Sequence, residues 1–305
     1  MKHAFRPLAL AAFFTSLAAF ILCALFLTVV GILSDHPLTY LSGGFWIAFC
    51  VILVLNAVSQ IPMTVLSRGL ATLPPTPGRA ALAGILAAAA SLAHSVGTVY
   101  LAVVSAGAPR ITLLLAALFS LIGAVGLALR AVFPGKYPTA EVLTLLPLPL
   151  SCVSYALYLY FETTIPKNGS LKLLVSLCFL ALALYLITDI RRSVGEPRPR
   201  LSLFLARAAA PLLASVSFSA LYWKIFRGVS AFGATAYVFL AAFAFYMFLV
   251  TCVPTLGDHS PHPLPFSVSQ NKGNPPASAD GSLAPTSPSD LDTPTPPTDN
   301  SHESE

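Results

Sequence analysis

The chain has 305 residues, of which 56% are hydrophobic and only 10% are charged, and its mean hydropathy is +0.79. Soluble domains carry about 25% charged residues, so this composition excludes an ordinary soluble domain and predicts a membrane protein. The net charge of +5 divides sharply, because residues 1–257 carry +11 and residues 258–305 carry −6. The cations of the first part are spread over many short loops, which favours contact with the anionic headgroups of a lipid bilayer and predicts no nucleic-acid partner.

Eight apolar runs predict an all-α fold, a polytopic transmembrane bundle of about eight helices. At about 1.5 Å of rise per residue, roughly 20 residues cross the hydrocarbon core of a bilayer. The runs cover residues 8–33, 41–63, 80–105, 111–133, 139–160, 171–190, 201–222 and 229–253. The first run follows a short basic lead, as a signal peptide does, but its 26 residues exceed a typical signal core. We therefore expect it to be retained, whereas its cleavage would leave seven spans.

Prolines interrupt two of these runs. The fifth run contains Pro147 and Pro149, and the seventh contains Pro211. Proline removes a helical hydrogen bond and clashes with the preceding turn, so we expect the fifth helix to break near its middle and the seventh to kink. Many transporters bind substrate at broken helices near the membrane midplane.

Lysine and arginine predict the orientation. With the N-terminus inside, the inner segments carry ten of these cations and the outer segments five. Much of the difference comes from an arginine block after the sixth run, namely Arg191, Arg192, Arg198 and Arg200. The positive-inside rule then places both termini in the cytoplasm of a cell that carries this protein in its cell membrane.

Residues 254–305 form an acidic tail rich in proline, serine and threonine. Such a composition offers little to bury, so we expect the tail to be disordered. It serves either as a solvated end or as a binding segment for a cytoplasmic protein partner.

Ionisable groups inside apolar runs are candidates for function, because an unpaired charge in hydrocarbon is costly. Arg207 lies about seven residues into the seventh run, and Asp189 lies near the inner end of the sixth. Arg207 either extends its side chain to the headgroups or pairs with Asp189. Asp189 has a second candidate partner in Arg192, three residues further along its own helix.

Two more polar groups lie within runs. His94 falls midway along the third run, beside a stripe of small residues, Ala83, Ala87, Ser91 and Ser95. This stripe predicts the close approach of another helix, and His94 is expected to be a neutral inter-helix hydrogen-bond partner, with a ligand or proton relay as the alternative. Asn56 and Gln60 in the second run are likewise expected to bond between helices, with a polar substrate path as the second interpretation.

The predicted outer loop between the fifth and sixth runs is the most polar part of the membrane domain. It gathers Glu162, Lys167, Asn168 and Lys172 beneath a group of tyrosines. We expect either a surface that contacts a small-molecule ligand or a headgroup-level turn with aromatic anchors.

No catalytic, cofactor or metal motif is present in the sequence. The five cysteines fall in separate apolar runs and form no CxxC pair, so they are expected to be buried and free. We therefore predict no metal site and no cofactor.

The run FETTIPKNGSLKLL, followed by one span and DIRRSVGEPRPR, resembles a feature of uncharacterised multi-pass membrane proteins of clostridia and related Firmicutes. The resemblance covers roughly residues 155–207, through Phe161, Glu162, Pro166, Asn168, Lys172, Arg191, Gly195, Pro197 and Arg198. It implies a bacterial cytoplasmic membrane and no particular activity.

Three functions compete at this point. The broken fifth helix and the buried polar groups favour a small-molecule carrier or permease component. The arginine block and tail favour a membrane sensor or scaffold. A lipid-modifying enzyme is less favoured, because the clustered His, Asp or Glu residues of acid–base or metal chemistry are missing.

Overall fold

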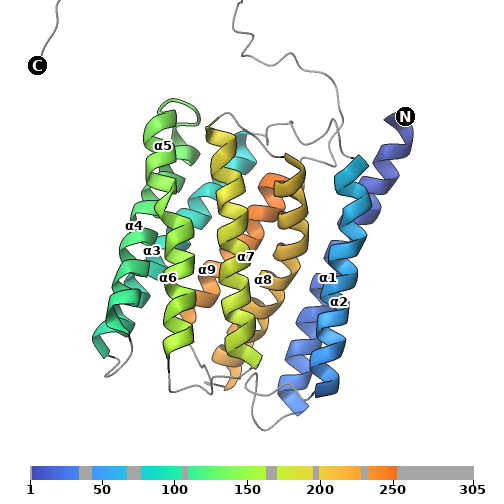
Figure 1. Ribbon diagram of the computed structural model, residues 1–305, viewed down its shortest axis with the longest axis horizontal. Helices are drawn as coiled ribbons and strands as arrows, with labels where there is room; N and C mark the ends of the chain where they lie inside the picture. Colours follow the sequence, from blue (N-terminus) through green and yellow to red (C-terminus); the bar gives the residue numbers. More distant parts are fainter. Residues whose placement is uncertain are drawn as a thin grey trace, which may run out of the picture. The chain divides into compact units, whose positions relative to one another are not determined.

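The computed structural model describes residues 2–33, 43–66, 77–104, 109–162, 170–194, 199–227 and 233–252 (Figure 1). Every regular element in these ranges is helical, which confirms the predicted all-α class. The elements are α1 (Lys2–Leu33), α2 (Gly43–Leu66), α3 (Pro77–Val104), α4 (Arg110–Val132), α5 (Pro138–Leu145), α6 (Pro147–Phe161), α7 (Ser170–Ser193), α8 (Pro199–Arg227), α9 (Ala234–Met247) and a π-helical turn (Phe248–Cys252). The predicted tail lies outside the described residues.

Within the described residues, five helical segments are long and apolar enough to cross a membrane, namely Gly78–Val104, Arg110–Val132, Pro138–Phe161, Leu171–Arg191 and Arg200–Phe226. Three shorter apolar helical segments cover Phe13–Val29, Ile47–Pro62 and Ala234–Val250. These segments fall within or closely match the apolar runs of the sequence. The chain is therefore a helical membrane protein by length and composition, and the full count of eight spans remains a prediction.

The helices from α3 to α9 form one packed group. Helix α3 packs along α4 and α9, α4 packs along α6, and α7 lies between α6 and α8. Helices α1 and α2 pack mainly against each other and against α8, at one edge of the group (Figure 1). This arrangement places α1 and α2 at the periphery of the group.

The small-residue stripe of α3 faces α4, as predicted. Ser95 Oγ donates to the carbonyl of Ala117 at 2.8 Å, and Ser120 Oγ donates to the carbonyl of Ser91 at 2.8 Å. Only small side chains let two backbones come close enough for such bonds between helices.

The predicted proline break is present but lies off centre. Helix α5 ends at Leu145 and α6 begins at Pro147, with Leu146 between them in a helical conformation. Pro147 and Pro149 have no N–H for the carbonyls four residues earlier, so the ladder of helical bonds is interrupted here. The break falls in the first half of the segment Pro138–Phe161, not at its middle.

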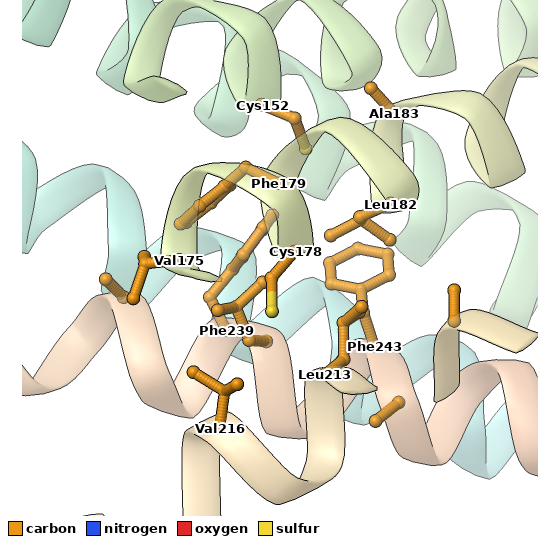
Figure 2. Close-up of a cluster of buried hydrophobic side chains, with 14 of the residues drawn as sticks. Cys152, Val175, Cys178, Phe179, Leu182, Ala183, Leu213, Val216, Phe239 and Phe243 are labelled. Atoms are coloured by element: carbon orange, nitrogen blue, oxygen red, sulfur yellow. The ribbon is translucent and has the colours of Figure 1, made fainter. Parts of the chain in front are cut away.

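The centre of the group is apolar and aromatic. Phe179 and Leu182 of α7, Leu213 of α8, and Phe239 and Phe243 of α9 meet there (Figure 2). Cys152 and Cys178 lie in the same layer and, like Cys23 elsewhere, are buried and free, as predicted. Cys50 is free but only half-buried, so the predicted burial is wrong for this residue.

Gly126 provides a test of this packing. A Cβ at Gly126 would lie 2.9 Å from the backbone nitrogen of Leu145, whereas a Cβ at Gly78 would have no atom within 4 Å. Overpacking costs about 1–3 kcal/mol, so Gly126→Ala should lower the melting temperature of the detergent-purified protein. Gly78→Ala is the matched control and should not lower it. Equal melting temperatures for the two variants would contradict the close approach of α4 and α5.

Candidate functional site

A buried ionic cluster joins α4, α5, α7 and α9. The Nε of Arg130 donates to Glu141 Oε1 at 2.8 Å, and its Nη1 donates to the hydroxyl of Tyr246 at 2.9 Å. Nη1 also donates to the carboxylate of Asp189. The hydroxyl of Tyr246 in turn donates to Asp189 Oδ2 at 3.1 Å. We call these four residues the Arg130 cluster.

Two charged residues of this cluster lie at helix ends that favour their charges. Arg130 lies in the last turn of α4 and Glu141 in the first turn of α5. A cation at a helix C-terminus and an anion at an N-terminus each interact favourably with the helix dipole. The turn between them contains Gly135 with φ +73°, a left-handed conformation that glycine adopts without strain.

The charged groups of the cluster are largely buried. The side chain of Asp189 is 3% exposed, that of Glu141 8% and that of Arg130 19%. One guanidinium therefore faces two carboxylates in largely water-free surroundings. Such an arrangement holds four helices together and can also exchange partners with an incoming proton or cation.

The structure gives Asp189 a partner that sequence reasoning missed. We expected Arg207 or Arg192, but Asp189 forms its ion pair with Arg130 of α4; the side chain of Arg192 lies outside the described part. Arg130 and Glu141 both fall inside predicted runs, so the rule that selected Asp189 could have selected them too. Nothing in the sequence pointed to Tyr246, because its hydroxyl meets Arg130 and Asp189 only through the packing of three helices.

Arg207 is buried in a second polar network. The residue is 1% exposed, so the predicted extension to the headgroups is wrong. Its carbonyl would normally accept the N–H of residue 211, which is a proline. Ser16 Oγ of α1 at 2.9 Å and Asn56 Nδ2 of α2 at 3.2 Å donate to this carbonyl instead. The predicted inter-helix bonding of Asn56 is confirmed.

Gln60 extends this network between α1 and α2. Its Nε2 donates to Thr15 Oγ1 at 3.1 Å and lies 3.4 Å from Asn56 Oδ1. The polar residues of α2 therefore fix α1 and α2 to each other and to α8.

His94 lies among aromatic rings and not among hydrogen-bonding groups. Its ring centroid is 4.9 Å from that of Tyr155, 4.6 Å from that of Phe239 and 5.8 Å from that of Phe179. The residue is 0% exposed, and neither of its ring nitrogens has a hydrogen-bond partner. The expected inter-helix hydrogen bond is therefore wrong.

The other end of α7 holds a second pair of buried ionisable residues. Glu162 is 7% exposed and Lys172 is 4% exposed, and Lys172 Nζ donates to the backbone carbonyl of Glu162. The hydroxyl of Tyr158 lies within hydrogen-bonding reach of the Glu162 side chain. The other two candidates of this loop, Lys167 and Asn168, lie outside the described residues.

A continuous row of side chains joins the two ends. Ring centroids are 5.5 Å apart for Tyr158 and Tyr155, 4.7 Å for Phe239 and Phe243, and 6.0 Å for Phe243 and Tyr246. His94 connects the two halves through its contacts with Tyr155 and Phe239. We call this row the central seam; it comprises Glu162, Tyr158, Tyr155, His94, Phe239, Phe243, Tyr246 and Asp189.

A groove of about 260 Å³ lies elsewhere, between α1, α8 and α9. Ser16 is the one polar side chain in its lining, which otherwise consists of residues such as Phe20, Pro211 and Phe245. This lining suits a lipid chain better than a polar molecule. Of the predicted site residues, Glu162, His94 and Asp189 thus share the central seam, whereas Asn56 and Arg207 belong to the network of α1, α2 and α8.

No protein-family model, curated protein or solved structure matches this chain. Its function is therefore inferred from the chemistry of the central seam and its surroundings.

The Arg130 cluster predicts unequal effects of two substitutions. Arg130→Met removes the guanidinium from two buried carboxylates, which should cost about 3–5 kcal/mol of stability. Asp189→Asn leaves the bond between Arg130 and Glu141 in place and should cost less. Thermal unfolding in detergent measures the stability loss of both variants. Arg110→Gln, which changes an exposed arginine, is the control. A smaller loss for Arg130→Met than for Asp189→Asn would contradict this arrangement.

The carbonyl of Arg207 predicts a coupling between two other substitutions. Ser16→Ala should destabilise the protein by about 0.6 kcal/mol, the average for a hydrogen bond between membrane helices. Pro211→Ala restores an N–H for the same carbonyl, so Ser16→Ala should cost less in that background. A double-mutant cycle of unfolding in detergent tests this. The same cost of Ser16→Ala in both backgrounds would show that Pro211 does not matter to this bond.

Proposed function

We propose that this protein is a carrier of the bacterial cytoplasmic membrane that moves a small molecule along the central seam. In this proposal all eight apolar segments cross the bilayer. Both termini face the cytoplasm.

The observation that supports a carrier best is the placement of buried ionisable groups along one path. Lys172 and Asp189 lie 17 residues apart on α7, which corresponds to about 25 Å of helix. His94 contacts Phe179, which lies between them on the same helix. Ionisable side chains inside a membrane are costly and typically mark substrate and proton paths. A purely structural bundle would not need charged or titratable groups at both ends and the centre of one seam.

The Arg130 cluster supplies chemistry for opening and closing one end of this path. A cationic group on a substrate would compete with Arg130 for Asp189 and Glu141. Loss of these pairs would release α4 and α5 from α7 and α9. The interrupted helix at Leu146 gives α5 a hinge for that movement.

The predicted orientation is consistent with the arrangement of the helices. The turn between α4 and α5 and the start of α1 lie at the same end of the group in Figure 1. This end carries Lys2, Arg130, Lys136 and Arg191. Under the positive-inside rule it faces the cytoplasm, and Glu162 and Lys172 then face the outside.

The sensor or scaffold function remains the alternative. It depends on the arginine block and the tail, most of which lie outside the described residues. Two results together would favour the sensor or scaffold. The full chain would pull down a cytoplasmic protein that a chain lacking residues 258–305 does not, and no transport would be detected.

A ligand screen followed by a flux assay tests the carrier. We expect a small cationic metabolite, such as an amine or a basic amino acid, to raise the melting temperature of the purified protein. A ligand at 100 times its dissociation constant stabilises by about 2.7 kcal/mol. Asp189→Asn should abolish this shift and the uptake of that ligand into proteoliposomes, whereas Arg110→Gln should preserve both. Uptake by the Asp189→Asn variant at the wild-type rate would contradict a path through the Arg130 cluster.

A further inference from the structure

We propose that the groove between α1, α8 and α9 is a binding site for one acyl chain of a membrane phospholipid. This groove is separate from the central seam, so the inference goes beyond the carrier function and does not depend on it. It requires that α8 lies in a membrane, which the length and composition of that helix indicate.

The groove arises from short side chains between three helices. Helix α8 packs along both α1 and α9, and the groove lies between these two neighbours. Ala210, Pro211 and Ala214 line it on the side of α8, and Ala241 and Ala244 line it on the side of α9. These side chains are too short to fill the space over α8, so an elongated hollow remains between α1 and α9.

Aromatic pairs mark the two ends of the groove. The ring centroids of Phe13 and Phe248 are 5.0 Å apart, and those of Phe20 and Phe218 are 5.7 Å apart. Phe13 and Phe20 are seven residues apart on α1, which corresponds to about 10 Å of helix. The first pair joins α1 to the turn that follows α9 and closes one end. The second pair joins α1 to α8 and leaves the side between Phe218 and Phe245 uncovered.

The uncovered side of the groove faces hydrocarbon. Phe218 and Phe245, which line it, are 53% and 44% exposed. Ala214 lies near the middle of the segment Arg200–Phe226, which is long and apolar enough to cross a membrane. At the middle of a bilayer the surrounding molecules present acyl chains and not headgroups. The molecules next to the groove are therefore lipid chains.

The size and chemistry of the groove also fit an acyl chain. Its volume is about 260 Å³. A protein cavity of about 150 Å³ holds benzene, so this groove accommodates roughly ten carbon atoms. Ser16, the polar side chain in the described lining, donates its hydroxyl hydrogen to the carbonyl of Arg207 at 2.9 Å. The lining therefore recognises its occupant by shape and apolar contact.

An acyl chain in the groove would add packing between α1 and α9. Atoms that line an empty groove lack contacts on one side, and each missing contact forfeits a small dispersion energy. Lipid tails are as apolar as this lining, so van der Waals contact and not the hydrophobic effect holds the chain. Helices α1 and α2 pack mainly against each other and α8. A chain that contacts both α1 and α9 therefore strengthens the attachment of this peripheral pair.

Photolabelling of the full chain in vesicles tests whether the groove is occupied. The vesicles consist of phosphatidylethanolamine and phosphatidylglycerol, with a trace of phosphatidylglycerol that carries a diazirine near the end of one acyl chain. We expect label around Ala214 and Ala241, two half-buried residues that line the groove. Label around Ala89, an exposed residue of α3, reports ordinary contact with the bilayer.

Two substitutions fill the groove from different helices. Ala241→Leu should reduce the labelling around Ala214 severalfold, and Ala214→Leu should do the same for Ala241, because the added side chain takes the place of the acyl chain. Ala89→Leu is the matched control and should leave both signals unchanged. The melting temperature of each variant shows that it is folded, and either groove variant suffices for the test.

The outcomes decide between occupants. Equal labelling of the groove in the wild type and a folded groove variant would overturn the proposal. Native mass spectrometry of the wild type released from the same vesicles should show a retained phospholipid, which Ala241→Leu loses. A retained fatty acid or metabolite in its place would overturn the phospholipid as occupant. An unlabelled groove in a chain that forms dimers would overturn it in favour of a second copy. None of these measurements involves transport, so failure of the carrier function leaves them unaffected.

Discussion

The cost of a charge in a low-dielectric interior governs this structure. Arg130, Glu141 and Asp189 come from three helices, and Arg130 pairs with both carboxylates at the end of the bundle. In a bilayer, no water is available to replace a missing partner, so these helices can separate only if the charges acquire new partners. The same bonds thus join α4, α5, α7 and α9 at one end of the bundle.

A missing backbone N–H donor likewise leaves a buried polar group in α8 that needs a new partner. Proline at position 211 releases the carbonyl of Arg207, and hydrogen bonds from Ser16 and Asn56 take its place. Helices α1 and α2 are therefore attached to α8 through a backbone carbonyl that lacks its helical hydrogen bond. This carbonyl gives a structural role to Ser16 and Asn56, two polar side chains in the first two apolar segments.

The sequence predicted the features that depend on local chemistry. The apolar lengths gave the helices, the prolines gave the break near Leu146, and the spacing of Ala83, Ala87, Ser91 and Ser95 gave the close contact of α3 with α4. It failed where a partner comes from a distant helix. Asp189 pairs with Arg130, 59 residues away, and His94 meets rings from α6, α7 and α9. Nothing in the local sequence of His94 distinguishes an aromatic cage from a hydrogen-bonding neighbour.

The bond between Asn56 and Arg207 also bears on how the protein is made. The two residues are 151 positions apart, so α2 leaves the ribosome long before α8 does. During that interval Ser16 and Asn56 lack the carbonyl that they later bind. Until α8 is made, α1 and α2 can form only the part of this network that joins them to each other, such as the bond from Gln60 to Thr15. The polar network of α1, α2 and α8 can therefore be completed only after α8 has been made.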